Sequence, residues 1–429
     1  MRFDLGTIPV TLALATAVGA LTSGCGAKTG PYVPDQGTNS EFDAGVDLGP
    51  QDMGPDMAIP CIEVPFDGGP VDLQLDVEAQ VGRADVVFLI DRTASMMDEI
   101  GEIRETLRTR LAPAIRTAIP DSEIGVATFA DFPVDPYGSR GDGDTPFSLR
   151  QRVTNDVAQV QTALATIDLG NGADIQESQV EALYQVVTGE GLDGFIDRSS
   201  GCPRGGFGYA CFRTDALPVV LLFTDATFHN GPGGAFPYAD ARVPGAATYD
   251  MAVEALRARG ARVIGFDSGE VGSGVPAVLS RLARDTETLA DGSPLVYDIG
   301  TRGQALGTSV VSAIETFAGT VVQDIEVVLS DGDRTDGVDP LELIEAIVAA
   351  EAIPPDGVSG TDGAKFLDAQ AGTQLFWQVT LRNGAVAPGA GPQRIRVRAV
   401  FLGDDRRRLD EELFDIVVPG ADGSGCESL

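Results

Sequence analysis

Residues with side-chain oxygens gather directly after an apolar run at residues 86–90, VVFLI. The run predicts a strand that is buried on both faces. The oxygen-bearing residues that follow it are Asp91, Thr93, Ser95, Asp98 and Glu99. A carboxylate followed by two hydroxyls at alternate positions can converge at the end of a strand, where these hard oxygens suit Mg²⁺, Mn²⁺ or Ca²⁺. In the alternative interpretation, Asp91 and Thr93 only cap the helix that follows.

A regular alternation of strands and helices surrounds this stretch. Further strands are predicted at residues 124–129, 147–153, 219–223, 263–266 and 295–299. Helices are predicted at residues 98–119, 157–167, 177–187, 247–259, 275–284 and 304–317. The alternation indicates an α/β fold with a doubly wound, mostly parallel sheet, in which ligands bind beyond the carboxyl ends of the strands. Asp225 closely follows a predicted strand, so we expect it at the same sheet edge as Asp91.

The flanks of this region carry a different pattern, in which apolar and polar residues alternate with period two. The alternating segments are residues 71–77, 325–329, 375–381, 395–401 and 413–418. They predict antiparallel strands, which we assign to a flanking β-sandwich domain in two parts, residues 61–84 and 319–426. The α/β domain, residues 85–318, would then be an insertion. A short helix is predicted at residues 340–348, with Asp339 as its cap.

The composition restricts the possible partners. The chain has 429 residues, of which 64 are acidic and 30 basic, and its formal net charge is −34. Such an acidic chain is a poor ligand for nucleic acid or for an anionic membrane surface. The excess of carboxylates suits a cation-binding protein, although solubility alone also accounts for it.

The N-terminal residues predict export. Residues 8–21 are apolar or small but too short to span a bilayer, so residues 1–25 are typical of a secretory signal peptide. They end in LTSGC, which resembles the lipobox of bacterial lipoproteins, with Thr22 replacing the usual aliphatic residue. The resemblance implies a lipid on Cys25 and an outer-membrane lipoprotein that faces the periplasm or the exterior, and plain secretion is the alternative. Residues 26–60, rich in Gly, Pro and Asp, predict a disordered linker.

The other cysteines indicate disulfides. In an oxidising compartment the remaining four allow three pairings. Proximity favours Cys202 with Cys211 across a short Gly-rich loop. Cys61 and Cys426 then bracket the folded region, and we expect them to pair.

The oxygen-bearing stretch resembles the metal-ion-dependent adhesion site of von Willebrand factor A domains, whose DxSxS pattern appears here as Asp91-x-Thr93-x-Ser95. The resemblance is closest to the I-like domain of integrin β subunits and covers residues 85–317. Three further segments are similar to that family: residues 124–137 (IGVATFADFPVDPY), 172–177 (GADIQE) and 223–229 (FTDATFH). The family's long specificity loop is reduced here to residues 138–146.

The resemblance implies three neighbouring cation sites. The central site, for Mg²⁺ or Mn²⁺, would be formed by Asp91, Thr93, Ser95, Glu177 and Asp225, several of them through water. An adjacent Ca²⁺ site would use Asp98 and Glu99. A third site, also for Ca²⁺, would use Asp131, Asp174 and Glu177. This third set departs from the family, because Gly172 stands where the family has an Asn ligand and Gln176 where it has Pro.

Two other features, a tripeptide and a histidine, have both a functional and a non-functional interpretation. Residues 140–142 spell Arg-Gly-Asp, an integrin-recognition tripeptide that chance also produces in a Gly- and Asp-rich loop. His229 is the single histidine, and the family has a non-catalytic His at that position.

The expected function is therefore a protein-binding module and not an enzyme. The chain carries no phosphate-binding loop, no nucleophile elbow and no HExxH motif. A partner's Asp or Glu would complete the cation in adhesion or assembly at a bacterial membrane. The alternatives are a metal-stabilised scaffold and a metal-assisted hydrolase with Glu177 or His229 as its base.

Overall fold

The computed structural model describes residues 59–335 and 337–428. The predicted signal peptide, Cys25 and nearly all of the predicted linker lie outside the described residues. Among the described helices, none is both long enough and apolar enough to cross a membrane.

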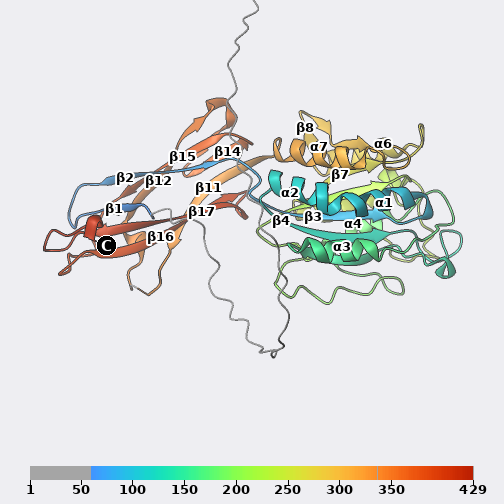
Figure 1. The fold of residues 1–429 in the computed structure, drawn as a ribbon, viewed down its shortest axis with the longest axis horizontal. Helices are drawn as coiled ribbons and strands as arrows, with labels where there is room; N and C mark the ends of the chain where they lie inside the picture. The colour runs from blue at the N-terminus through green and yellow to red at the C-terminus, as the bar shows by residue number, and fades with distance from the viewer. Residues whose placement is uncertain (1–58, 336, 429) are drawn as a thin grey trace, which may run out of the picture. The chain divides into compact units, whose positions relative to one another are not determined.

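A mixed six-stranded sheet forms the centre of the α/β region (Figure 1), and its strands have the order β10–β7–β6–β3–β4–β5. The strands are β3 Arg83–Asp91, β4 Asp121–Phe129, β5 Ser148–Thr154, β6 Leu217–Thr224, β7 Arg262–Asp267 and β10 Val296–Asp298. All neighbouring strands are parallel except β5, which runs antiparallel to β4 at the edge. The mostly parallel sheet agrees with the strand–helix alternation of the sequence.

The strand order places a ligand crevice between β3 and β6. Numbered within this sheet, the strands follow the doubly wound order 3-2-1-4-5-6, whose direction of growth reverses between strands 1 and 4. Those two strands are β3 and β6, and their last paired residues are Ile90 and Phe223. Asp91 and Thr224 therefore end side by side at the reversal point, where doubly wound sheets bind their ligands.

Helices cover both faces of the sheet and bury its apolar strands. One face carries α1 Met97–Thr106, α2 Ala112–Ala118, α3 Val157–Ala165 and α7 Leu306–Ala318. The other carries α4 Gln179–Thr188, α5 Tyr249–Ala258 and α6 Val275–Asp285. On β3, Phe88 packs in the first core and Leu89 in the second, and both are fully buried. A strand enclosed in this way needs an apolar side chain at every position, which explains the unbroken run before Asp91.

Two further sheets lie outside the α/β region and share one apolar core around the fully buried Trp377. The six-stranded sheet has the order β1–β17–β16–β11–β14–β13, and the three-stranded sheet β12–β15–β2. The strands are β1 Cys61–Glu63, β2 Val71–Glu78, β11 Val322–Asp331, β12 Ile344–Ile353, β13 Gly360–Asp362, β14 Lys365–Gln370, β15 Gln374–Leu381, β16 Gln393–Gly403 and β17 Arg407–Val418. Because β2 pairs with β15, segments from before and after the α/β region meet in one sheet.

The helix predicted at residues 340–348 is wrong beyond its first turn. Asp339 caps the turn as expected, since its Oδ1 accepts a hydrogen bond of 3.0 Å from the amide of Leu341. The turn is a 3₁₀-helix that ends at Leu343, and β12 follows it. Residues 344–353, which include several Ala and Glu, pair along β15, and this tertiary pairing overrides a modest helical preference.

Both expected disulfides are present, Cys61–Cys426 and Cys202–Cys211, with sequence separations of 365 and 9 residues. A longer closed loop restricts the unfolded chain more, so the two bonds should contribute unequally to stability. We expect the double Ser variant at Cys61 and Cys426 to lose about 5 kcal/mol of unfolding free energy, and the variant at Cys202 and Cys211 about 2 to 3 kcal/mol. Urea unfolding of both variants measures this, and equal losses would contradict the loop-length argument.

Candidate metal centre

Asp91 ends β3 fully buried, and hydroxyl groups hold its carboxylate in place. Its Oδ1 accepts hydrogen bonds from the amide of Thr93 at 3.0 Å and from the Thr93 hydroxyl at 2.7 Å. Its Oδ2 accepts a bond of 2.8 Å from the hydroxyl of Thr224 on β6. The Oγ atoms of Thr93 and Ser95 are 3.1 Å apart. The Asp-x-Thr-x-Ser stretch thus converges as its spacing predicted, with Ser95 exposed at the rim.

Backbone hydrogen bonds hold the loop of Glu177 against the loop that follows β6. The amide of Glu177 donates to the carbonyl of Thr227 at 3.2 Å, and the amide of His229 donates to the Glu177 carbonyl at 3.0 Å. On α4, Gln179 Nε2 donates to Thr224 Oγ1 at 2.9 Å. The side chain of Asp225, on the same post-strand loop, bonds Ser95. The loops that carry Glu177 and Asp225 are therefore fastened to the strand ends beside Asp91.

The charges at this edge repel one another. Burial and, next, the charge of Asp225 raise the pKa of Asp91 to about 7. Burial followed by the charges of Asp91, Asp131 and Asp174 raises the pKa of Glu177 to about 11. The pKa of Glu177 is therefore raised by Asp91, from the predicted central site, and by Asp131 and Asp174, from the predicted third site.

The predicted adjacent pair occupies the first turn of α1, and its members face different ways. Asp98 is exposed, whereas Glu99 is 1% exposed and its Oε2 has no hydrogen-bond partner. Burial, and to a lesser extent the charges of Asp225 and Asp98, raise the pKa of Glu99. Asp267, at the end of β7, lies close enough to Asp225 for that charge to add to the burial that raises its own pKa. Sequence reasoning missed Asp267, although it follows a buried strand just as Asp91 does.

At the third predicted site the structure brings together two of the three predicted residues and His229. Asp131, Asp174 and His229 each offer one ligand atom, and these atoms all lie within 4.8 Å of one another. Asp144, which sequence reasoning also missed, holds the loop at residues 171–172 through hydrogen bonds. Its Oδ1 accepts hydrogen bonds from the amides of Asn171 at 2.8 Å and Gly172 at 3.1 Å.

Unsatisfied carboxylate oxygens test whether these residues suit a cation. Within the part of the chain that the structure describes, three carboxylates have a buried oxygen without a hydrogen-bond partner: Glu99, Asp131 and Glu177. All three belong to the predicted sites. A buried anionic oxygen is costly unless a hydrogen bond or a cation compensates it, so the donor set fits divalent cations.

The Arg-Gly-Asp tripeptide forms an exposed 3₁₀ turn, Arg140–Asp142. The hydroxyl of Ser139 accepts a hydrogen bond of 3.0 Å from Gly141 and closes the turn.

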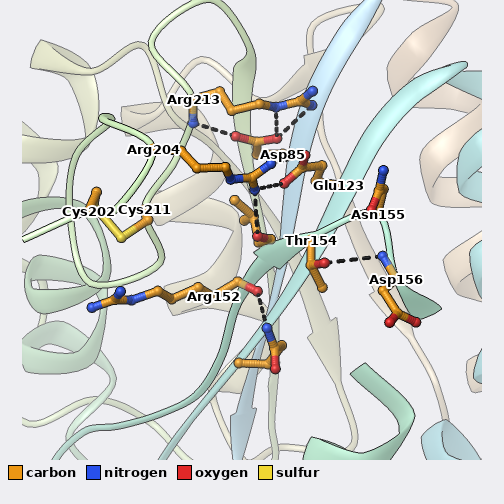
Figure 2. Close-up of polar contacts among 12 residues, drawn as sticks. Asp85, Glu123, Arg152, Thr154, Asn155, Asp156, Cys202, Arg204, Cys211 and Arg213 are labelled. Carbon is orange, nitrogen blue, oxygen red and sulfur yellow. Dashed lines mark hydrogen bonds and ion pairs between the residues drawn. A yellow bond between two sulfur atoms is a disulfide. The ribbon is translucent and has the colours of Figure 1, made fainter. Parts of the chain in front are cut away.

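A cavity of about 500 Å³ lies away from this edge, between β5 and the loop closed by Cys202 and Cys211. Figure 2 shows that two of the arginines that line it, Arg204 and Arg213, are paired with carboxylates. Arg204 binds Glu123 through both terminal nitrogens, at 3.1 and 2.7 Å, and Arg213 Nε donates to Asp85 Oδ1 at 2.8 Å. Burial outweighs that pairing and raises the pKa of Asp85 to about 6. This network anchors the start of β3, at the opposite end of the strand from Asp91.

No family model matches the chain and no curated protein matches it. Among similar solved structures, a von Willebrand factor type A protein from Catenulispora acidiphila is 12% identical over 85% of this chain and 73% of its own, with a TM-score of 0.34. The pilus adhesin SpaC from Lactobacillus rhamnosus GG is 12% identical over 83% of this chain and 46% of its own, with a TM-score of 0.33. The ArnB paralog VWA2 from Sulfolobus acidocaldarius is 13% identical over 83% and 73%, with a TM-score of 0.29.

One of these solved structures is described as a von Willebrand factor type A protein and another as a pilus adhesin. The function proposed below depends on the residues of the metal centre.

Proposed function

We propose that the protein is a divalent-cation-dependent module that binds another protein in adhesion or assembly. The observation that carries the proposal is the set of buried carboxylate oxygens without partners on Glu99, Asp131 and Glu177. They surround a strand end where Asp91 is already oriented by three hydrogen bonds. A preorganised cluster of carboxylates of this kind supports cation binding more directly than it supports a purely structural role.

Different residues would bind the cation and leave one side of it accessible to a partner. Asp91, Thr93 and Ser95 would hold it at the strand end, and Glu177 and Asp225 would complete the set, several of them through water. A bound Mg²⁺ or Mn²⁺ would supply a positive centre that accepts the carboxylate of a partner's Asp or Glu. Because Ser95 is exposed while Asp91 is buried, a partner would approach from the hydroxyl side.

Asp98 and Glu99 would hold an adjacent Ca²⁺ at the start of α1. The exposed carboxylate of Asp98 and the buried one of Glu99 give that site one accessible and one fixed ligand. A cation there would lie beside the central group, because the charge of Asp225 acts on Glu99.

Hydrolysis is the weaker alternative. It needs a base that reaches water on the cation. His229 is only 4% exposed, so its ring is poorly placed to take a proton from solvent-accessible water. A metal-stabilised scaffold remains the other alternative, and it differs from a binding module in lacking a cation-dependent partner.

A capture experiment separates the three functions. The immobilised lipid-free protein is incubated with envelope extract of the source cells in millimolar Mg²⁺ and Ca²⁺, and then eluted with EDTA. We expect a specific set of proteins in the eluate that is absent when EDTA is present throughout. An empty eluate would support the scaffold, and cation-dependent cleavage of the retained proteins would support the hydrolase.

We also propose that the two flanking sheets form a β-sandwich that carries the α/β region as an insert, similar to the hybrid domain of integrin β subunits. The shared core around Trp377 and the pairing of β2 with β15 support this arrangement. Limited proteolysis tests it: the products should include a resistant fragment near residues 85–318, and the remaining pieces should stay joined through Cys61 and Cys426 until they are reduced.

Attachment to the membrane through Cys25 is a further part of the proposal. A single acyl chain gives weak, reversible membrane binding, whereas several chains hold a protein firmly. We expect Cys25→Ser to move the protein from the membrane fraction to the soluble fraction. Unchanged partitioning in cell fractionation would indicate plain secretion or another anchor.

A further inference from the structure

The imidazole of His229 is held in one tautomer. Its Nδ1 lies 2.8 Å from the carbonyl oxygen of Phe236. A carbonyl oxygen only accepts hydrogen bonds, so Nδ1 carries a proton and donates it. In the neutral ring, Nε2 is then an unprotonated nitrogen with a free lone pair. Histidines that bind metals are commonly oriented in this way by a backbone carbonyl.

The lone pair of Nε2 points at two carboxylates. Nε2 lies 3.1 Å from Oδ2 and 3.3 Å from Oδ1 of Asp174, and 3.4 Å from Oδ2 of Asp131. Ionised carboxylates only accept hydrogen bonds, so these electron-rich atoms need a cation among them. That cation is either a metal ion or a proton shared by Nε2 and the carboxylates.

The two carboxylate oxygens of Asp131 differ, because one accepts hydrogen bonds and the other has no hydrogen-bond partner. Its Oδ1 accepts hydrogen bonds from the hydroxyl of Tyr238 and from the amide of Phe132, the latter at 2.6 Å. Its Oδ2 is buried and has no hydrogen-bond partner. Asp131 itself is fully buried, so no solvent compensates that oxygen. The carboxylate is thus oriented by one oxygen and unsatisfied at the other, on the side that faces His229.

The ligand atoms that meet at this site are one imidazole nitrogen and the oxygens of two carboxylates, a set that includes nitrogen as well as oxygen. Calcium takes six to eight oxygen ligands. At residue 172, a glycine with φ of +65°, an added Cβ would lie 2.4 Å from Oε1 of Glu177. A side chain at residue 172 would therefore be strained and would displace the Glu177 carboxylate, and Gly172 supplies no side-chain ligand.

We propose that His229 Nε2, Asp131 and Asp174 bind a first-row transition-metal ion, of which Zn²⁺ is the best match, in place of the Ca²⁺ expected from the resemblance. One imidazole nitrogen and two carboxylates form a ligand set that zinc accepts readily, with Glu177 or water available for the fourth position. The inference rests on the proposed function only in that Glu177 also belongs to the central site. The proposal gives the single histidine a metal-binding role, whereas the sequence analysis included His229 in none of the three cation sites.

Zinc X-ray absorption tests the nitrogen ligand directly. The full chain, stripped of metal, is loaded with one equivalent of Zn²⁺ in a large excess of Ca²⁺ and Mg²⁺, which fill the oxygen sites. We expect outer-shell scattering from one imidazole per zinc. Because the chain has one histidine, this signal identifies His229 without ambiguity. A zinc shell of oxygens alone would overturn the proposal and leave either Ca²⁺ or a protonated His229 among the carboxylates.

Calorimetry of variants supplies a second readout. We expect His229→Gln and Asp174→Asn to weaken Zn²⁺ binding at least about 10-fold, as losses around metal sites commonly do. Asp174 is exposed, so its variant should fold even if His229→Gln does not. The control Asp142→Asn removes an exposed carboxylate outside the set and should bind Zn²⁺ as the parent does. Equal affinity in Asp174→Asn and the parent would overturn the proposal.

Asp91→Ala distinguishes this proposal from the proposed function. It removes a ligand of the central site and none of the third, so the imidazole signal should persist in it. If that signal persists while the parent captures no partner, the zinc site stands and the binding function fails. If the parent captures a partner and no imidazole signal is found, the zinc site fails alone.

Discussion

Replacing Asp91 with alanine is expected to abolish cation-dependent capture of a protein partner while the chain stays folded. The carboxylate is the best-oriented acidic ligand of the central site, with hydrogen bonds from Thr93 and Thr224 to both of its oxygens. Its loss should weaken Mg²⁺ binding by more than about 100-fold, since even changes to residues behind the ligands cost 10- to 100-fold. Calorimetry with Mg²⁺ and the capture experiment measure the two effects.

The fold should survive because Asp91 follows the apolar part of β3 and contributes no apolar side chain to either core. Its removal also relieves the repulsion with Asp225. Asp142→Ala is the matched control, because it removes an exposed carboxylate from a turn outside the site. Retained Mg²⁺-dependent capture in a folded Asp91→Ala variant would place the binding site elsewhere. A variant without near-ultraviolet circular dichroism would show that Asp91 is structural.

The stability gained from a divalent cation should grow as pH rises. Folding raises the pKa of Asp91 from its ordinary 3.8 to about 7, chiefly through burial. Between these values the native state binds more protons than the unfolded state, so without a cation the free energy of unfolding falls as pH rises. Asp91 alone should lower it by on the order of 4 kcal/mol across that window. Glu177, with a pKa of about 11, continues the decline in the same direction.

A bound cation offsets this decline because it stabilises the ionised ligands and binds only the native state. We therefore expect the difference in melting temperature between Mg²⁺ and EDTA samples to be small at pH 5 and several degrees larger at pH 8. The EDTA samples contain NaCl at matched ionic strength, because the net charge of −34 also responds to screening. A difference that stays constant with pH would contradict the assignment of buried ligands.

The sequence by itself determined the sheet edge and which oxygen-bearing residues lie at its centre. Residues 86–90 are all apolar and must be buried on both faces, so the strand ends where Asp91 begins the polar stretch. The same reasoning placed Asp225 and should have found Asp267. These inferences succeed because they depend on local patterns, namely an apolar run, its last residue and the spacing of oxygens after it. The disulfide partners also followed, from proximity and from where the ends of the folded region should lie.

Only the tertiary structure decided which atoms of those residues remain free. Residues 344–353 form a strand rather than part of a helix because they pair with β15, which lies further along the chain. The free Oδ2 of Asp131 results from Tyr238, a residue 107 positions away that occupies the other oxygen. The direction of the His229 lone pair is set by the carbonyl of Phe236. A local sequence pattern does not predict such contacts, because they join residues that are separated in the sequence and meet only when the chain is folded.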